Sequence, residues 1–171
     1  NYIDYNNANT VAQAMINNSA TYGTTKSGLV TGTQWDTIMK WYQSSNINVD
    51  TTQDWGTYSN LTYNGNGKYF TYLGSAPTRW SEGAFTRTGS GGYPYYYHAS
   101  GLNISGIKKN IADLGGNVWE WSAEYYRKGI YSNRGGSSVN NSNEYSSSNR
   151  FSNPLSCAEY YLGFRVVLYI Q

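Results

Sequence analysis

Glu120 is the residue whose setting most clearly suggests chemistry, because it stands between Trp119 and Trp121 in the stretch GNVWEW. The two tryptophans are expected in the core, and a carboxylate between them should not stay unpaired in a medium of low dielectric. We therefore expect Glu120 to be exposed, salt-bridged, or a ligand to a hard cation. Arg134 and Arg165 follow along the chain, and their guanidinium donors suit acidic or carbonyl groups that pin loops.

His98 is the single histidine of the chain, which excludes a multi-histidine iron or zinc site. A Ser-His-Asp hydrolase is arithmetically allowed, but no nucleophile-elbow motif accompanies His98. We expect His98 to be a surface or hydrogen-bonded residue. Cys157 has no thiol partner, and the spacing of the ten acidic residues nominates no pair for glycoside hydrolysis.

The composition disfavours a nucleic-acid-binding protein and is typical of a protein with ligand-binding loops. With 171 residues, a net charge of +2 and 13% charged residues, the chain suits one domain without the basic field that attracts nucleic acid. No apolar run approaches the ~20 residues of a membrane span, and the first residues lack the features of a signal peptide. The 19 tyrosines and 19 glycines, with abundant Asn and Ser, are typical of binding loops in a secreted, β-rich or loop-rich protein.

Two helices are predicted near the start of the chain. Asn9 or Thr10 is the expected cap of the first helix, which should end at the turn around Gly23. Thr33 and Asp36 resemble a capping box for the second helix, which should bury its apolar stripe and stop near residues 44–46. The stripe residues are Val11, Ala14, Met15 and Asn18 in the first helix and Trp35, Ile38, Met39 and Tyr42 in the second.

Two strands and several loops are predicted in the rest of the chain. Residues 162–171 alternate between apolar and mixed positions, which predicts one strand with a wholly apolar, buried face. Residues 118–126 should form a strand with both tryptophans on one face. Little regular structure is expected over 55–109, apart from a hairpin turn at 64–67 that leads into a strand at 68–73. The Ser- and Asn-rich residues 137–149 predict a long ordered loop.

The order NIADLGGNVWEW, then RGGS, then GFRV resembles the formylglycine-generating enzyme or sulfatase-modifying factor family. This resemblance implies an α+β, C-type-lectin-like fold with two short helices, a small antiparallel sheet and extensive irregular loops. The chain would be a single domain over 1–171 that lacks the strand-rich segment with which the family usually begins. The structural anchors implied by the motifs are Gly116, Asn117, Trp119, Trp121, Arg134, Gly135, Gly136, Gly163, Phe164 and Arg165.

The same resemblance bears on metals and on catalysis. It implies a structural calcium ion held by Gly116, Val118 and Glu120, with further oxygen ligands from elsewhere. The oxidising members of the family activate copper with two cysteines after RGGS, and Asn140 and Tyr145 stand at those positions here. Neither residue supplies the soft thiolate that such copper needs. We therefore expect a protein that is not an enzyme and that requires no cofactor.

Folds of this branch also resemble the variable proteins of diversity-generating retroelements, in which adenine-directed mutagenesis rewrites codons near the carboxyl end. Asn codons treated in this way readily yield Tyr or Ser, and residues 122–162 show these residues between fixed anchors. The expected ligand-binding residues are Tyr125, Tyr126, Tyr131, Asn133, Ser138, Asn140, Asn141, Asn143, Tyr145, Ser156, Tyr160 and Tyr161.

The expected partner is a protein or glycan on another cell or host surface, with Tyr supplying contact area and Ser and Asn supplying adaptable hydrogen bonds. Such a domain would be extracellular, on a bacterial cell surface or a phage virion. A lectin-like adhesin of fixed specificity is the main alternative. An oxidoreductase of the formylglycine-generating type is a second alternative, which the missing cysteines disfavour.

Overall fold

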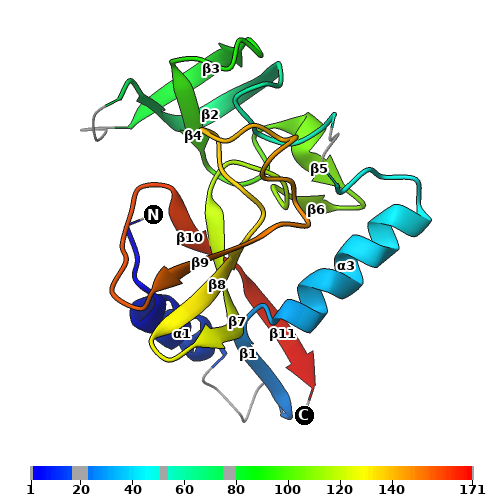
Figure 1. Ribbon diagram of the computed structural model, residues 1–171, viewed down its shortest axis with the longest axis vertical. Helices are drawn as coiled ribbons and strands as arrows, with labels where there is room; N and C mark the ends of the chain where they lie inside the picture. Colours follow the sequence, from blue (N-terminus) through cyan, green and yellow to red (C-terminus); the bar gives the residue numbers. More distant parts are fainter. Residues whose placement is uncertain (1, 17–22, 51–53, 75–79, 171) are drawn as a thin grey trace.

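The protein has an α+β architecture in which two helices accompany several small sheets (Figure 1), as a computed structural model describes for residues 2–16, 23–50, 54–74 and 80–170. The helices are α1 (Tyr5–Ala14), α3 (Gly32–Ser44) and the short 3₁₀ helix η1 (Ile104–Gly106). The strands are β1 (Thr25–Leu29), β2 (Tyr63–Tyr72), β3 (Ser81–Arg87), β4 (Tyr95–His98), β5 (Ile107–Lys108), β6 (Ile111–Ala112), β7 (Trp119–Arg127), β8 (Ile130–Arg134), β9 (Arg150–Pro154), β10 (Leu162–Phe164) and β11 (Val166–Ile170).

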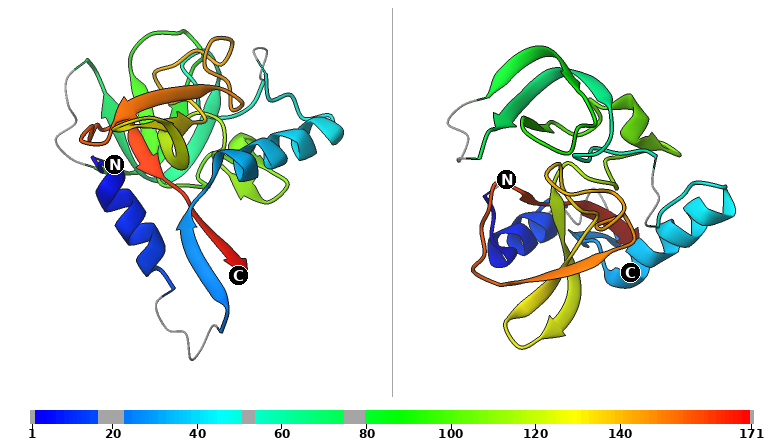
Figure 2. Two further views of the ribbon diagram at one scale, coloured as in Figure 1. Left: turned by 60° about the horizontal axis from the view of Figure 1, so that its bottom comes forward. Right: turned by 45° about the horizontal axis from the view of Figure 1, so that its top comes forward.

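The largest sheet has the strand order β10-β7-β8-β9, in which β10 and β7 are parallel and the other pairs are antiparallel. Three smaller antiparallel sheets have the orders β3-β2-β4, β1-β11 and β5-β6. The β1-β11 ribbon extends away from the four-stranded sheet (Figure 2). None of the described helices is long and apolar enough to cross a membrane.

Helix α1 starts earlier than predicted and buries a different face. Its cap is Asp4, whose carboxylate accepts a hydrogen bond from the backbone N–H of Asn7 at 2.8 Å, so a cap at Asn9 or Thr10 is wrong. Ala8 and Ala12 are its fully buried side chains, one turn apart. Val11 and Met15 of the expected stripe are exposed to solvent. Asn18, the last residue of that stripe, lies outside the described residues. Small alanines allow α1 to pack closely on β1, and hydrophobicity alone did not reveal that face.

Helix α3 was predicted correctly in its buried face and in its end at Ser44, but not in its cap. Thr31 is the N-cap, and it forms a reciprocal capping box with Gln34 at 2.9 and 3.1 Å. The expected box of Thr33 and Asp36 is therefore wrong by two residues. The buried residues Trp35, Met39 and Tyr42 lie on the predicted stripe.

Residues 55–109 contain far more regular structure than predicted. The expected hairpin turn at 64–67 is wrong, because these residues lie within β2, which pairs with β3 over 63–69. Gly65 faces the ring of Phe85 so closely that a β-carbon would overlap it, and a β-carbon on Gly67 would crowd Leu102. These two glycines therefore serve close packing inside a strand rather than a turn.

The C-terminal residues form two strands instead of one. β10 pairs with β7, whereas β11 pairs with β1, and the chain changes sheets at Arg165. Leu162 is fully buried, but Leu168 and Ile170 are exposed on the projecting ribbon, so the predicted burial of the whole apolar face is wrong. In β7, by contrast, Trp119 and Trp121 are both buried as expected.

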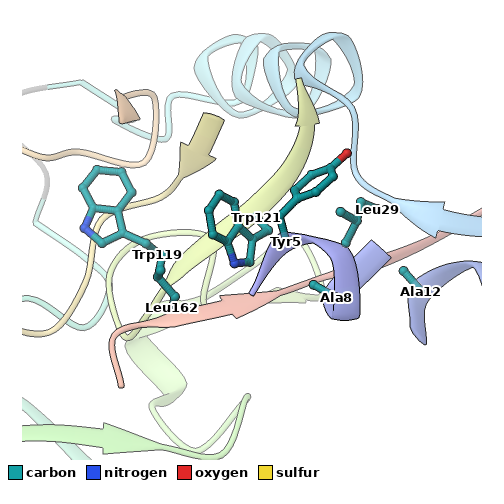
Figure 3. Packing of buried hydrophobic residues seen from close by; sticks show 7 residues of the cluster. All are labelled: Tyr5, Ala8, Ala12, Leu29, Trp119, Trp121 and Leu162. Carbon is teal, nitrogen blue, oxygen red and sulfur yellow. The ribbon is translucent and has the colours of Figure 1, made fainter. Parts of the chain in front are cut away.

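The core around the four-stranded sheet is centred on Trp121, which packs against α1 (Figure 3). The ring of Trp121 meets Tyr5 edge to face at 5.7 Å, and its Nε1 donates to the carbonyl of Ile3 at 2.9 Å. Leu162 and Leu29 belong to the same buried cluster. A second buried cluster gathers around α3. The two clusters pack α1 and α3 against the sheets, and the loop over 135–149 begins where β8 ends.

Candidate ligand-binding site

A small aromatic pocket lies where the loop after β8 meets the start of β7 and the segment before β10. Its volume is about 170 Å³. Trp119 lies edge to face with Tyr145, with ring centroids 5.9 Å apart, and is tilted against Phe151 at 5.6 Å. The lining residues are Trp119, Ser137, Val139, Asn140, Tyr145, Phe151 and Tyr161. We call this cavity the aromatic pocket.

Arg134 holds the loop that forms one wall of the aromatic pocket. Its side chain is completely buried and donates to Asp36 of α3 and to the carbonyls of Ser148 and Asn149, the latter two at 3.1 and 3.3 Å. Burial lowers the pKa of Arg134 to about 10, which leaves the guanidinium charged at neutral pH. The indole of Trp35 adds a hydrogen bond from Nε1 to the carbonyl of residue 147 at 2.8 Å. The expected pairing of Arg134 with acidic and carbonyl groups is therefore confirmed.

Gly135 and Gly136 allow the sharp turn that follows Arg134. Both have positive φ, and the carbonyl of Gly135 accepts a hydrogen bond from the Tyr58 hydroxyl at 2.7 Å. A β-carbon on Gly136 would overlap the carbonyl of Tyr145. This close approach brings Tyr145 to the wall of the aromatic pocket.

Asn140 and Tyr145 occupy the two positions at which the resemblance expects thiols. The side-chain oxygen of Asn140 accepts hydrogen bonds from the backbone N–H and the hydroxyl of Ser137, at 2.9 and 2.8 Å. Its backbone carbonyl accepts two more from Ser59. Cys157 is half-buried elsewhere and does not line the pocket. The pocket therefore offers aromatic rings, an amide and hydroxyls where a redox centre would need sulfur.

Glu120 lies on the other side of β7 and is salt-bridged, one of the three outcomes expected for it. Arg165 donates to both of its carboxylate oxygens, from Nε at 2.9 Å and from Nη2 at 2.7 Å. Nη2 also donates to the carbonyl of Ala112 at 2.8 Å. Burial raises the pKa of Glu120, and the charge and hydrogen bonds of Arg165 oppose that rise.

A second cavity of about 390 Å³ adjoins this pair, and Asp113, Val118 and Glu120 are among its lining residues. Asp113 is buried, and its Oδ2 accepts hydrogen bonds from the hydroxyl of Ser100 and from the N–H of Gly101. Its Oδ1 is buried without a hydrogen-bond partner in the described part of the chain. Arg165 is the only Arg or Lys among the residues that line this cavity, against the two buried carboxylates of Asp113 and Glu120, so the lining has an excess of acidic groups.

This donor set fits a hard cation in part. Val118 and Glu120 line the cavity as expected for calcium, whereas Gly116 is not among its lining residues. The Glu120 carboxylate is already bound by Arg165, and Asp113, which the sequence did not suggest, supplies the free oxygen. Within the described ranges no three Asp, Glu, His or Cys side chains gather, so an ion here would depend on carbonyl oxygens as well.

The motifs around these two cavities fall in the part of the chain that matches a family model. Residues 97–170 match the sulfatase-modifying factor enzyme 1-like domain. The match supports a relationship to the formylglycine-generating enzyme and sulfatase-modifying factor family. No curated protein and no solved structure matches the chain significantly. The sulfatase-modifying factor match contains β7 to β11 and every residue that lines the aromatic pocket.

Within the matched segment, Asn117 shows why its motif position is an anchor. Its backbone has positive φ, and its side-chain amide exchanges two hydrogen bonds with the backbone of His98, at 3.0 and 3.1 Å. His98 is buried, not on the surface, and its ring contacts the hydroxyl of Thr57 at 3.1 Å and the carbonyl of Ala99 at 2.9 Å. The expectation that His98 is hydrogen-bonded is confirmed, and the surface alternative is wrong.

Three of the expected ligand-binding residues, Asn140, Tyr145 and Tyr161, meet in the aromatic pocket. Tyr125 and Tyr126 lie apart from them near the exposed end of β7, and each exposes 62% of its surface. The remaining residues that keep some exposure are Tyr131, Asn141, Asn143, Ser156 and Tyr160. The expected residues thus divide between a pocket and separate exposed positions.

Two of the expected ligand-binding residues are wrong. Asn133 and Ser138 are completely buried and present no side-chain surface to a ligand. Asn133 faces inward from β8, where its side-chain oxygen accepts a hydrogen bond from Asn153 at 2.6 Å. Ser138 lies in the loop over 135–149 with its side chain turned inward, where its hydroxyl is 3.3 Å from that of Tyr63.

Sequence reasoning also missed several pocket residues. Ser137, Val139 and Phe151 line the aromatic pocket but were not among the expected set. Ser137 is the last residue of RGGS and Val139 comes two residues later, so their nearness to that anchor is a signal that could have found them. Phe151 gave no such signal, because its place depends on the register of β9 against β8, where it lies opposite Asn133.

Proposed function

We propose that this chain is a non-catalytic, ligand-binding display domain with a C-type-lectin-like fold, related to the variable proteins of diversity-generating retroelements. Its ligand would be a protein or glycan on another cell or host surface, met by the Tyr-, Asn- and Ser-rich C-terminal segment. The observation that carries the proposal is the aromatic pocket, in which Asn140 and Tyr145 stand where the oxidising relatives place thiols.

A division between fixed and free side chains supports the display function. Arg134, Gly135 and Gly136 are buried and tie the loop over 135–149 to α3 and to the core. We call these buried motif residues and the four-stranded sheet that carries them the frame. Tyr126 and Asn143 are exposed and outside that frame. Side chains at exposed positions of this kind can change with little effect on stability. A rigid base with replaceable surface residues is what a diversified binding protein needs.

The test lies in the DNA around the coding sequence. We expect a reverse-transcriptase gene and a near-copy of the segment that encodes residues 121–170, with mismatches only at template adenines. The structure refines this expectation, since mismatches should fall on codons for exposed residues such as Tyr126 and Asn143 and spare the buried Asn133 and Ser138. Mismatches spread over all bases, or the absence of any near-copy, would contradict diversification and leave a lectin-like adhesin of fixed specificity.

The enzyme alternative has a separate test. Copper or iron in a one-to-one ratio with the purified protein, together with turnover of a peptide thiol, would overturn the non-catalytic proposal. We expect neither, because Asn140 and Tyr145 give no thiolate pair for copper. We propose an extracellular location, on a bacterial surface or a phage virion, because a display domain of this kind must meet its ligand outside the cell.

We also propose that a structural calcium ion belongs to the frame. Asp113, Val118 and Glu120 would supply oxygen ligands from the wall of the second cavity, with the free Oδ1 of Asp113 as the principal one. Its part would be to neutralise the buried carboxylate charge that Arg165 alone leaves uncompensated. The ion would brace β7 against the segment that precedes it and would take no part in chemistry.

A further inference from the structure

The aromatic pocket has the composition of a site for a small organic cation. Four aromatic rings line it, those of Trp119, Tyr145, Phe151 and Tyr161, and the ring of Trp119 contacts those of Tyr145 and Phe151. Aromatic faces carry negative charge density, and a methylated ammonium enclosed by several rings gains cation–π attraction without the hydration cost of a primary ammonium. A volume of about 170 Å³ lies below the roughly 300–1,000 Å³ of ordinary ligand pockets, so it suits one head group rather than a whole ligand.

The charges around the aromatic pocket favour a cation. No Lys or Arg is among its lining residues. Arg150 precedes Phe151 in sequence, but its guanidinium is bound by Asp36 and Glu124. Glu159 precedes Tyr161 by two residues, so the segment that supplies one wall carries a carboxylate.

Polar groups at the aromatic pocket favour a cation that carries an oxygen close to its nitrogen. The Asn140 oxygen is occupied by Ser137, while its Nδ2 has no hydrogen-bond partner in the described part of the chain. The hydroxyl of Tyr145 is likewise without a described partner and is not buried. These donors match an oxygen two carbons from a trimethylammonium group better than the all-carbon stem of a methylated lysine.

We propose that the aromatic pocket binds the trimethylammonium head group of choline, free or esterified to a larger ligand. The proposal rests on the ligand-binding function proposed above and names the ligand class of that same site. Trp119, Tyr145, Phe151 and Tyr161 enclose the cation, and Asn140 donates to the neighbouring oxygen.

Titration of the purified chain with choline chloride, followed by ligand-observed NMR and calorimetry, tests this assignment. The decisive comparison is 3,3-dimethyl-1-butanol, which has the shape of choline with carbon in place of the charged nitrogen. We expect choline to bind about ten times more tightly than this neutral isostere. Equal affinities, or the absence of choline binding at millimolar concentrations, would overturn the proposal.

Variants locate the binding in the aromatic pocket. Tyr145→Leu and Phe151→Leu should each weaken choline binding about tenfold. Trp41→Leu, which changes an exposed ring on α3 outside the pocket, should leave it unchanged. Phe151 is 46% exposed, so its variant should fold even if Tyr145→Leu does not, and circular dichroism checks both. An unchanged affinity in a folded Phe151→Leu variant contradicts the assignment.

Two further ligands distinguish the source of the cation. Phosphocholine keeps the trimethylammonium group and an oxygen at the same spacing, so we expect it to bind, although no Lys or Arg lines the pocket to pair with its phosphate. Tighter binding of Nε-trimethyllysine than of phosphocholine would overturn the choline assignment in favour of a methylated protein. The search for a near-copy in the surrounding DNA does not depend on choline. If a near-copy is present and choline does not bind, the choline assignment is rejected and the display function stands.

Discussion

Arg165 closes a two-point ion pair with Glu120 across 45 residues of sequence, with Nε and Nη2 donating to the two carboxylate oxygens at 2.9 and 2.7 Å. Glu120 lies in β7, and Arg165 lies at the point where the chain leaves β10 for β11. The pair therefore joins the central strand of the large sheet to the junction between two sheets. A guanidinium is needed here, because an ammonium cannot donate two parallel hydrogen bonds to one carboxylate.

Removal of Arg165 should destabilise the fold strongly. Arg165→Met leaves Glu120 buried without its partner, which should cost about 3–5 kcal/mol of unfolding free energy at pH 7 in urea denaturation. Arg165→Met combined with Glu120→Leu should recover much of that loss, since the pair is then replaced by apolar groups. A loss below about 1 kcal/mol for the single variant would show that the pair contributes little.

The pH dependence of the same variant has a definite sign. Burial raises the folded-state pKa of Glu120, so the folded chain holds this proton more readily than the unfolded chain. Ionisation of Glu120 therefore weakens the fold as pH rises through the ordinary and then the raised pKa. Without Arg165 the pKa should rise further, so the penalty of Arg165→Met should be larger at pH 7 than at pH 4. Equal penalties at the two pH values would contradict this account.

Arg134 and Arg150 provide a matched pair, because both bind Asp36 but differ in burial. Arg134 is completely buried and also donates to two loop carbonyls, whereas the side chain of Arg150 is 47% exposed. Arg134→Met should cost at least about 3 kcal/mol, since it removes several charge-assisted hydrogen bonds at once. Arg150→Met should cost less than about 1 kcal/mol, as is usual for exposed ion pairs. Chemical denaturation of both variants checks the difference, and equal losses would contradict it.

Gly116 and Gly129 both have positive φ, at 78° and 74°, but only Gly116 is crowded by other atoms. Alanine variants at the two positions therefore distinguish backbone strain from steric overlap. A β-carbon on Gly116 would overlap the carbonyl of Thr57, while one on Gly129 would meet no atom within 4 Å. Gly129→Ala should cost about 1–2 kcal/mol from the left-handed backbone alone. Gly116→Ala should cost more than about 4 kcal/mol or prevent folding. A Gly116→Ala protein as stable as Gly129→Ala would rule out the close approach to Thr57.

The sequence predicted elements whose signal is local and missed those decided by packing. The stripe of α3 was visible because Trp35, Met39 and Tyr42 recur at helical spacing and are buried together. Gly65 and Gly67 gave an equally strong turn signal, yet they lie in β2, where the absence of a β-carbon leaves room for Phe85 and Leu102. Nothing within a few residues of a glycine distinguishes these two uses.

The candidate site shows the same limit. The motif residues Trp119 and Arg134 were expected to be structural, and both are buried in the frame. The pairing of Glu120 with Arg165, rather than with another base, depends on the crossing of β10 and β11 and could not be read from spacing. Asn133 matched the expected pattern of a surface residue, but the register of β8 turns it inward.

Calcium should stabilise the chain if the second cavity holds the proposed ion. At a concentration about 100 times the Kd the gain is about 2.7 kcal/mol, or roughly 5–10 °C in Tm for a domain of this size. Asp113→Asn should abolish most of the shift, because it replaces the free carboxylate oxygen. Asp54→Asn, at an exposed acid, is the matched control and should keep the shift. The same Tm in calcium and in chelator would reject the ion.

The display function finally predicts which expected positions tolerate exchange. Tyr126→Ser and Asn143→Tyr change exposed side chains and should alter the unfolding free energy by no more than about 0.5 kcal/mol. Asn133→Ser removes the acceptor of Asn153 from the interior and opens a space beneath β9, so it should cost about 1–3 kcal/mol. Thermal and urea unfolding of the three variants provide the measurement. A large loss of unfolding free energy for Tyr126→Ser, or none for Asn133→Ser, would contradict this division into exposed and buried positions. Diversification can be sustained only at positions where a substitution leaves the fold unchanged.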